Sequence, residues 1–126
     1  MDLASWNKHL RQPALARIAP LLMDNTITEI MINGPSRVFV ERGGVMLLVD
    51  MRFRGDEELM QAVQALLLPG GPEVATSAPC VDFRLPDGTR GNVIIPPLAL
   101  NGPVVTLRKF TKLLTKAGDL VRIGTL

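Results

Sequence analysis

The chain has 126 residues, of which 47% are hydrophobic and 21% are charged, and its formal net charge is +2. This length is enough for one domain with its own core, without disulfides or metal ions. The small net charge, the lack of Lys/Arg runs and an aromatic content of 4% argue against a nucleic-acid-binding protein. With one cysteine and one histidine, the chain lacks the residues for an internal disulfide or a usual zinc site, and nothing else supports a Cys–His catalytic pair.

The single cysteine suits a reducing compartment, and the first residues show no apolar signal-peptide core. The longest apolar run, residues 93–100, is interrupted by Pro96-Pro97 and is too short to span a bilayer. We therefore expect a cytoplasmic location.

Residues 1–13 form an N-terminal arm in our interpretation, either a loose segment or a helix that needs a partner. Leu3, Trp6 and Leu10 recur at spacings of three and four, which gives one weak apolar stripe. Such a stripe suits packing against another domain or subunit, and a terminal tail without fixed structure explains the segment equally well.

Two short helical segments are expected after the arm. Pro13 and Pro20 each suit the first position of a helix, so residues 14–19 and 20–23 are predicted to be helical with a break at Pro20.

Three strands are predicted next, at residues 27–33, 37–42 and 45–49. Gly43-Gly44 is typical of a tight hairpin between the last two. Residues 45–49 are apolar throughout, which favours a central strand or one covered on both faces.

Residues 56–68 give the clearest helix. Its first turn carries three acidic side chains, which favour the positive end of the helix dipole. One apolar stripe is expected to face the core, formed by Leu59, Val63, Leu66 and Leu67.

Three further strands are predicted at residues 80–85, 90–95 and 104–108. The first two are joined by the turn Pro86-Asp87-Gly88, and the last two by the proline-rich loop 96–103, which leaves the sheet. This apolar loop either folds back on the core or contacts a partner, with a slight preference for the partner.

Polar and apolar residues alternate along these three strands, and a period of two puts alternate side chains on opposite faces of a sheet. The apolar face is expected to be core. The polar face is expected to carry Cys80, Asp82, Arg84, Arg90, Asn92, Thr106 and Arg108. Cys80 itself is expected to be a small buried or half-buried side chain.

The polar face has two interpretations. Arginine makes planar, bidentate contacts to phosphate and keeps its charge, so Arg84, Arg90 and Arg108 are suited to holding a phosphate. Alternatively, Asp82 pairs with Arg90 or Arg108 across strands, as exposed side chains often do. Gly91 stands where a β-branched residue is expected, and it predicts a weakened or bent strand beside Arg90.

The order of elements is helix, three strands, helix, three strands, joined mostly by short links. This order predicts an α+β fold of the PAS-like kind, with a mainly antiparallel sheet of about six strands and helices on one face.

Four segments carry a family resemblance: ITEIMINGP, VERGG, DFRLPDG and PPLALNGP. In combination, they resemble the N-terminal domain of the type II/IV secretion ATPases. Within that family they are most similar to the CpaF-like branch, which drives tight-adherence (Flp) pilus assembly. The resemblance runs from about residue 14 to residue 126, and it rests on the combination rather than on any single segment.

The resemblance implies a function and candidate site residues. In these ATPases the N-terminal domain swings over the nucleotide and delivers two arginines to its phosphates. By position these match Arg90, after the LPDG turn, and Arg108, in the last strand; Arg84 and Lys109 are lesser candidates. The resemblance implies no catalytic residue and no metal ligand in this chain, and it assigns ATP and Mg to the full-length family.

The implied partners are the catalytic domain of the same or a neighbouring subunit, a homo-hexamer in full-length form, and inner-membrane secretion or pilus platform proteins. No nucleic acid is among them. The implied location is cytoplasmic and peripheral at the inner membrane, through those partners.

In that family a catalytic domain follows, with a phosphate loop of the form G-x-x-x-x-G-K-[ST]. That string does not occur in this sequence, because neither Gly43-Gly44 nor Gly70-Gly71 leads into it. We expect a domain at residues 14–110 and the start of a linker to an absent catalytic domain at residues 111–126, including a short helix capped by Thr115. The chain alone is therefore not expected to be an enzyme.

Two other hypotheses belong to different classes. One is a stand-alone PAS-like module that binds a ligand or a protein, although the few aromatic residues and single histidine argue against haem or flavin. The other is a small nucleic-acid binder, which the weak charge disfavours.

Overall fold

The computed structural model describes residues 2–68, 71–75 and 77–109. In chain order the elements are α1 (Leu3–His9), the 3-10 turn η1 (Pro13–Leu15), α2 (Ala19–Met23), β1 (Ile27–Asn33), β2 (Val38–Arg42), β3 (Val45–Leu48), α3 (Asp56–Leu66), β4 (Cys80–Arg84), β5 (Arg90–Ile94) and β6 (Val104–Arg108). The predicted linker and the helix capped by Thr115 lie outside the described residues.

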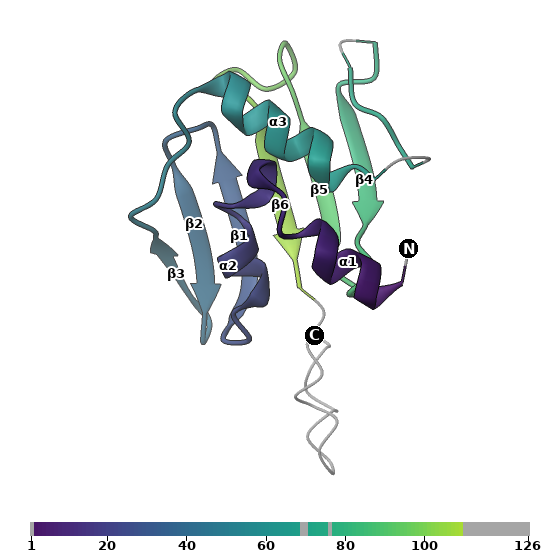
Figure 1. Cartoon of the computed structure of the whole chain (residues 1–126). Coiled ribbons are helices and arrows are strands. Elements are labelled where there is room, and N and C mark those ends of the chain that lie inside the picture. The colour runs from purple at the N-terminus through teal and green to yellow at the C-terminus, as the bar shows by residue number, and fades with distance from the viewer. Residues whose placement is uncertain (1, 69–70, 76, 110–126) are drawn as a thin grey trace.

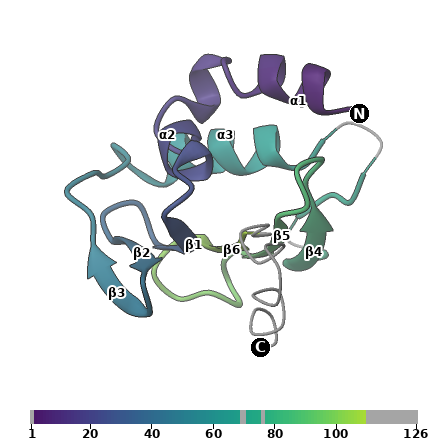
Figure 2. The same cartoon turned by 90° about the horizontal axis from the view of Figure 1, so that it is seen from below.

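The strands form one six-stranded sheet in the order β3-β2-β1-β6-β5-β4, and every neighbouring pair is antiparallel. Figures 1 and 2 show α1, α2 and α3 together on one face of this sheet. The predicted α+β class, with about six antiparallel strands and helices on one face, is confirmed. We call the opposite face, which no described helix covers, the open face.

Short turns that contain glycine join the strands within two hairpins. The hairpin between β2 and β3 turns at Gly43 and Gly44, whose φ angles of 59° and 82° lie in the region that favours glycine. Between β4 and β5, the Thr89 N–H donates to Asp87 Oδ1 at 2.9 Å and Gly88 has a φ of 94°, as its turn sequence predicts.

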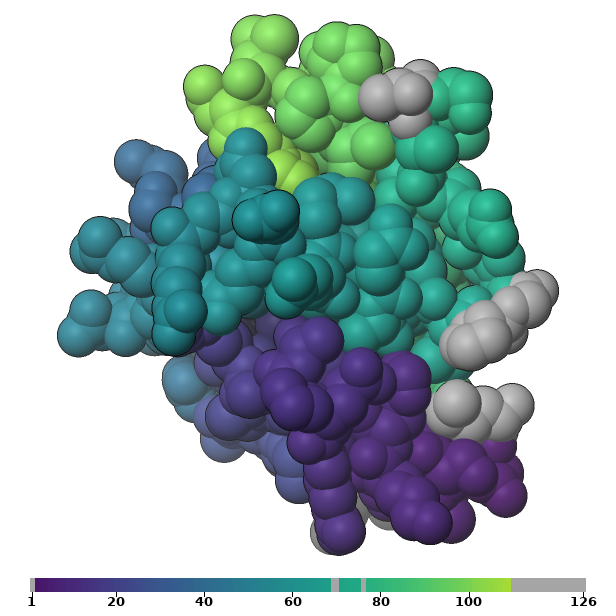
Figure 3. Space-filling model, turned by 45° about the horizontal axis from the view of Figure 1, so that its top comes forward, coloured from purple at the N-terminus to yellow at the C-terminus, as the bar shows by residue number. Residues whose placement is uncertain are grey.

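The core lies between the sheet and the helices. A register shift at the start of β1, between Ile27 and Glu29, lets both Ile27 and Ile30 point inward. Figure 3 shows α3 between the N-terminal helices and loop 96–103. The largest fully buried side chains are Trp6, Leu15, Ile18, Ile27, Ile30, Ile32, Val38, Val40, Leu59, Val63, Leu66 and Leu107. The stripe predicted for α3 is part of this core.

The N-terminal segment contains helix α1, as one interpretation of residues 1–13 proposed, but this helix packs on its own domain rather than on a partner. The side chain of Trp6 is 1% exposed within the same core as α3. His9 Nε2 lies 2.7 Å from the Ala65 carbonyl oxygen, to which its N–H donates in the matching tautomer. Trp6 and Leu10 of the stripe are thus buried in the core of the same domain, whereas Leu3 stays 54% exposed.

The prediction for residues 45–49 was wrong in its placement. β3 is an edge strand, and its four side chains are between 43% and 66% exposed: Val45, Met46, Leu47 and Leu48. The helices lie over the part of the sheet from β1 to β4 and do not reach the edge at β3 (Figure 2). An apolar run therefore marks a strand here, but not a buried one.

Loop 96–103 folds back on the core in part, as one of the two expectations proposed, and contact with a partner stays a prediction. Ala99 is buried, whereas Leu98 and Leu100 are 59% and 90% exposed. The loop also returns to the sheet, because the Gly34 N–H donates to the Pro103 carbonyl oxygen at 3.0 Å. The two Asn-Gly-Pro turns of the chain, at residues 33–35 and 101–103, thus lie against each other.

Gly34 gives a test of this contact. Its φ is 77°, and a Cβ there would lie 2.7 Å from the Asn101 carbonyl oxygen, a backbone atom. Gly43 also has a positive φ, 59°, but nothing lies within 4 Å of its Cβ position. We expect Gly43→Ala to lower the free energy of unfolding by about 1–2 kcal/mol, the usual cost of the conformation, and Gly34→Ala to lower it clearly more. Urea denaturation of both variants measures this, and equal losses would contradict the tight turn-to-turn packing.

Candidate functional site

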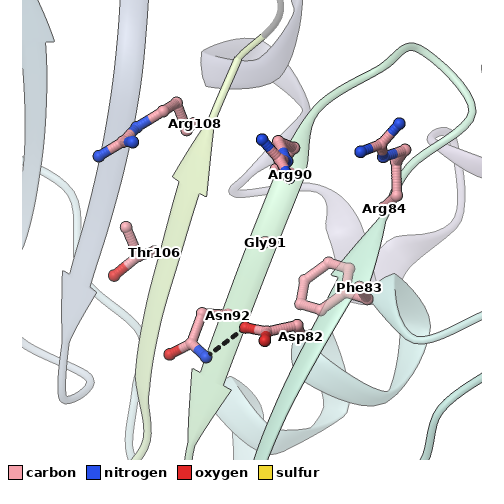
Figure 4. A pocket seen from close by; sticks show the side chains of 8 residues that line it. All are labelled: Asp82, Phe83, Arg84, Arg90, Gly91, Asn92, Thr106 and Arg108. Atoms are coloured by element: carbon pink, nitrogen blue, oxygen red, sulfur yellow. Dashed lines mark hydrogen bonds between the residues drawn. The ribbon is translucent and has the colours of Figure 1, made fainter.

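The three arginines lie in one row across the open face. Arg84 is directly opposite Arg90, and Arg90 is directly opposite Arg108, on the adjacent strands β4, β5 and β6. Figure 4 shows the three side chains projecting at the same level. Neighbouring strands are about 4.8 Å apart, and like charges directly opposite each other are destabilising. The row is therefore a place where a bound anion would relieve repulsion.

Only one of these arginines pairs with a carboxylate among the described residues. Arg108 Nη2 lies 3.8 Å from Glu29 Oε1, whereas the other ion pairs found in that part of the chain involve neither Arg84 nor Arg90. All three arginines are exposed. Their guanidinium groups are thus accessible to a ligand.

Asp82 does not pair with an arginine, so the alternative interpretation of the polar face was wrong. Asn92 Nδ2 donates to Asp82 Oδ1 at 2.8 Å and to the Val81 carbonyl oxygen at 3.4 Å (Figure 4). Asp82 is opposite Asn92 in the register, one row away from the arginines. The amide of Asn92 is thus the partner of Asp82, and no carboxylate in the described part of the chain pairs with Arg90.

The row borders an open hollow of about 570 Å³. Its lining combines guanidinium, amide, hydroxyl and carboxylate groups, from Asp82, Phe83, Arg84, Arg90, Gly91, Asn92, Thr106 and Arg108 (Figure 4). Because the hollow is open, a ligand there would keep most of its surface in water unless a second surface covers it.

The packing of Phe83 explains why position 91 holds a glycine, which the sequence did not reveal. A Cβ at this position would lie 2.2 Å from Phe83 Cζ, so the aromatic ring occupies that space on the core face. Phe83 is directly opposite Gly91, and the register of β5 continues without a shift against both neighbours. The ring thus covers the gap that the glycine leaves, and Arg90 stays in line with its row.

Lys109 points away from the arginines. Its Nζ donates to the carbonyl oxygens of Leu21 and Asp24, and burial lowers the pKa of its ammonium group. These bonds tie the end of β6 to the end of α2. The structure thus brings Arg84, Arg90 and Arg108 together and leaves Lys109 out.

Asp24 anchors the same corner of the domain. Its Oδ1 accepts from the hydroxyl and the N–H of Thr26 at 2.6 and 2.9 Å, and its Oδ2 accepts from Arg42 Nη1 at 2.9 Å. The hydrogen bonds from Thr26, followed by that from Arg42, hold the pKa of the Asp24 carboxyl well below its usual range.

This lowered pKa predicts a pH dependence of stability. A carboxyl with a lower pKa in the folded state stabilises the fold above its unfolded-state pKa, and this contribution is lost as the pH falls through the folded-state value. We expect Asp24→Asn to be less stable than the wild type at pH 5 and the difference to narrow by pH 3. Urea denaturation at several pH values measures it, and a difference that is independent of pH would contradict it.

Cys80 is exposed on the open face, contrary to the expectation of a buried or half-buried side chain. It lies at the start of β4, near Asn92, whose Nδ2 is 3.7 Å from Sγ. Position 80 alternates with the core-facing residues of its strand, so its exposure follows from the same period that exposes Asp82 and Arg84.

Within the described ranges, no group of three or more His, Cys, Asp or Glu side chains could hold a metal ion. No helix in that part of the chain is long and apolar enough to cross a membrane.

Two acidic residues extend the row, and sequence reasoning missed them. Glu29 is directly opposite Arg108, and Glu41 is directly opposite Glu29. The row therefore reads Arg84, Arg90, Arg108, Glu29 and Glu41 across five strands. Alternation along β1 and β2 puts both glutamates on a polar face, but their alignment with the arginines depends on strand order, which no pattern in the sequence gives.

Comparison with known proteins identifies the family. A family model described as "Type II/IV secretion system protein" matches residues 12–126. The chain belongs to this family.

Relatives of known structure support the match. The VirB11 ATPase of the Brucella suis type IV secretion system, solved in complex with sulphate, is similar with a TM-score of 0.67 and 30% identity, over 86% of this chain and 33% of that one. The Legionella pneumophila ATPase DotB shares the fold, with a TM-score of 0.52 and 16% identity over 96% of this chain and 34% of that one.

Relatives found by sequence similarity support the same family. The Brucella suis type IV secretion system protein VirB11 is 31% identical over 107 residues, 84% of this chain and 28% of the relative. An uncharacterized protein of Methanocaldococcus jannaschii is 30% identical over 113 residues, 88% of this chain and 20% of the relative. The chain spans 15–28% of the length of the curated relatives it matches. It thus corresponds to one region of a secretion-system ATPase.

Proposed function

We propose that this chain is the N-terminal regulatory and assembly region of a secretion or pilus-assembly ATPase, in which Arg90 and Arg108 contact the phosphates of a nucleotide held by a catalytic domain. The observation that carries the proposal is the row of three arginines on the open face, directly opposite one another. Arg84 has a supporting part at the edge of the row, and Lys109 has none in this arrangement because its ammonium group bonds to α2.

Phosphate fits this row for physical reasons. Guanidinium groups bind phosphate oxygens in a planar, bidentate way, and an anion carrying more than one charge offsets the repulsion between neighbouring arginines. Phosphoryl-transfer enzymes with a phosphate loop use an arginine from outside that loop to stabilise the transferred group. The similar VirB11 of Brucella suis was crystallised with sulphate, an anion of the same shape and charge class.

The open hollow supports a nucleotide site to which two domains contribute. It offers arginines but little enclosure, and an anion on an open surface keeps its hydration and binds weakly. A catalytic domain of the same or a neighbouring subunit would supply the phosphate loop, the Mg ion and the second wall. Under this proposal the family's ATP site is completed only when both domains are present.

The finer assignments are part of the same proposal. The segments ITEIMINGP and PPLALNGP favour the tight-adherence (Flp) pilus assembly branch, and the two NGP turns at their ends contact each other here. The full-length protein would form a homo-hexamer in the cytoplasm and bind inner-membrane platform proteins. The exposed apolar side chains of β3 and of Leu98 and Leu100 are suited to such contacts.

The same exposed apolar residues favour one alternative, a stand-alone PAS-like protein-interaction module. A bound coloured cofactor would favour the ligand-binding form of that alternative, and the absorbance spectrum of the purified chain tests it directly. The nucleic-acid hypothesis has no comparable support, and the salt dependence of DNA association tests it.

The isolated chain is expected to have no ATPase activity and to bind ATP with at best a millimolar dissociation constant. Arginines on an open face provide no adenine pocket and little desolvation. Calorimetry and a coupled ATPase assay measure both properties. Micromolar binding, or turnover abolished by mutating a residue of this chain, would refute the expectation.

In a full-length protein that contains this region, Arg90→Ala and Arg108→Ala are each expected to lower ATP turnover at least tenfold while changing the free energy of unfolding by less than about 1 kcal/mol. Both side chains are exposed, so truncation removes charge without opening a cavity.

Leu107→Ala is the control from the same strand. Its side chain is fully buried, so the variant should lose about 2–5 kcal/mol of stability. If either arginine variant keeps wild-type turnover and pilus output, that arginine is only a surface residue and the proposed contact is wrong.

A further inference from the structure

We propose that Glu29 is a positioning residue that holds Arg108 away from Arg90 until an anion binds, and so sets how readily the row accepts phosphate. This inference rests on the proposed function, because it concerns the same row of arginines. It adds a residue of opposite charge on a strand from the other half of the sheet.

The register makes Glu29 the direct neighbour of Arg108. The two residues face each other across β1 and β6, and Arg90 faces Arg108 from the other side, on β5. Arg108 therefore stands between a carboxylate and a guanidinium group. In the structure its Nη2 lies 3.8 Å from Glu29 Oε1, and Figure 4 shows its guanidinium group directed toward β1, away from Arg90.

The two partners differ in how freely they can move. The Glu29 side chain is 16% exposed, whereas that of Arg108 is 72% exposed. The carboxylate is thus held by its surroundings, and the long arginine side chain is the part that can swing. Rotation of the arginine would bring its charge next to Arg90 at the cost of leaving the carboxylate.

The ion pair between Glu29 and Arg108 is close enough to orient the arginine side chain and weak enough to break when an anion binds. A distance of 3.8 Å exceeds that of a hydrogen bond, and ion pairs with one exposed partner contribute little. Among the described residues, the Glu29 carboxylate accepts no side-chain hydrogen bond that would replace this pair. A phosphate group between Arg90 and Arg108 offers bidentate, charge-assisted bonds instead.

Binding of an anion is therefore an exchange. Arg108 leaves one carboxylate and gains one phosphate, and the nearby negative charge of Glu29 opposes the incoming anion. Removing that charge while keeping the shape of the side chain should make phosphate binding tighter. A residue that only supported the fold would change stability and leave affinity unaltered.

The probe is inorganic pyrophosphate, titrated into the 126-residue chain at 0.15 M salt and followed by the NMR signals of the arginine Nε–Hε groups. We expect Glu29→Gln to tighten binding about two- to fivefold, the range of a partly exposed ion pair. In the anion-free protein, the same variant should shift the Arg108 signal and leave the Arg84 signal in place.

Glu41→Gln is the matched control. It removes the same charge from the same row, one strand further from Arg108. It should change affinity by less than 1.5-fold, because screening weakens interactions over that added distance. In an Arg108→Ala background, Glu29→Gln should tighten binding by less than 1.5-fold, because only the screened repulsion between Glu29 and the anion remains.

The outcomes separate this inference from the proposed function. Equal tightening by Glu29→Gln and Glu41→Gln, or no tightening by Glu29→Gln, refutes the positioning role while the arginine site stands, provided that Arg90→Ala weakens binding. Pyrophosphate binding that is absent from the wild type and from every variant refutes the positioning role, whereas the proposed function, which needs the catalytic domain to complete the site, is then decided by the turnover of the full-length Arg90→Ala protein.

Discussion

The pairing of β1 with β6 holds together two parts of the chain that are distant in sequence. Strands β1, β2 and β3 form one antiparallel meander, and β4, β5 and β6 form another. Their mutual position depends on the register from Glu29–Arg108 to Asn33–Val104. A slip of one residue would turn Arg108 into the core and Leu107 into water. The buried pair of Ile30 and Leu107, which lie directly opposite each other, opposes such a slip.

Period-two alternation made the faces of the last three strands predictable. It placed Val93 and Leu107 in the core and Arg90 and Arg108 on the polar face, and burial agrees at each position. Alternation acts within a strand, so it cannot say which strands are neighbours. The alignment of the three arginines depends on the registers of two consecutive strand pairs, and the place of Glu29 beside them depends on the pairing of β1 with β6, which are far apart in the chain. The alignment of the arginines and the position of Glu29 could therefore be known only from the structure.

The incorrect predictions for β3 and for residues 1–13 have a common physical reason, which is that both depend on tertiary packing. The apolar run of β3 was interpreted as buried because hydrophobicity is usually a sign of burial, but the helices do not reach the edge of the sheet at β3. The seven-residue helix α1 is too short to be stable alone, so its sequence gave a weak signal. Trp6 makes the helix a part of the domain by packing into a core formed by residues far along the chain. In both cases tertiary packing decided, and local patterns did not.

The charges of the open face also limit where an anion can sit. Along the row, Glu29 and Glu41 occupy the end at β1 and β2, so among the described residues the positive charge without a carboxylate partner lies at Arg84 and Arg90. Across the row, Asp82 stands two residues from Arg84 on β4, and its carboxylate is held in place by Asn92. Two residues along a strand span about 6.6 Å, so a phosphate that moved toward Asp82 would meet a fixed negative charge. Carboxylates thus lie on two sides of the positive region, and under the proposed function they would confine a phosphate to the level of the arginines, with Arg108 as the member of the row that could join it or withdraw.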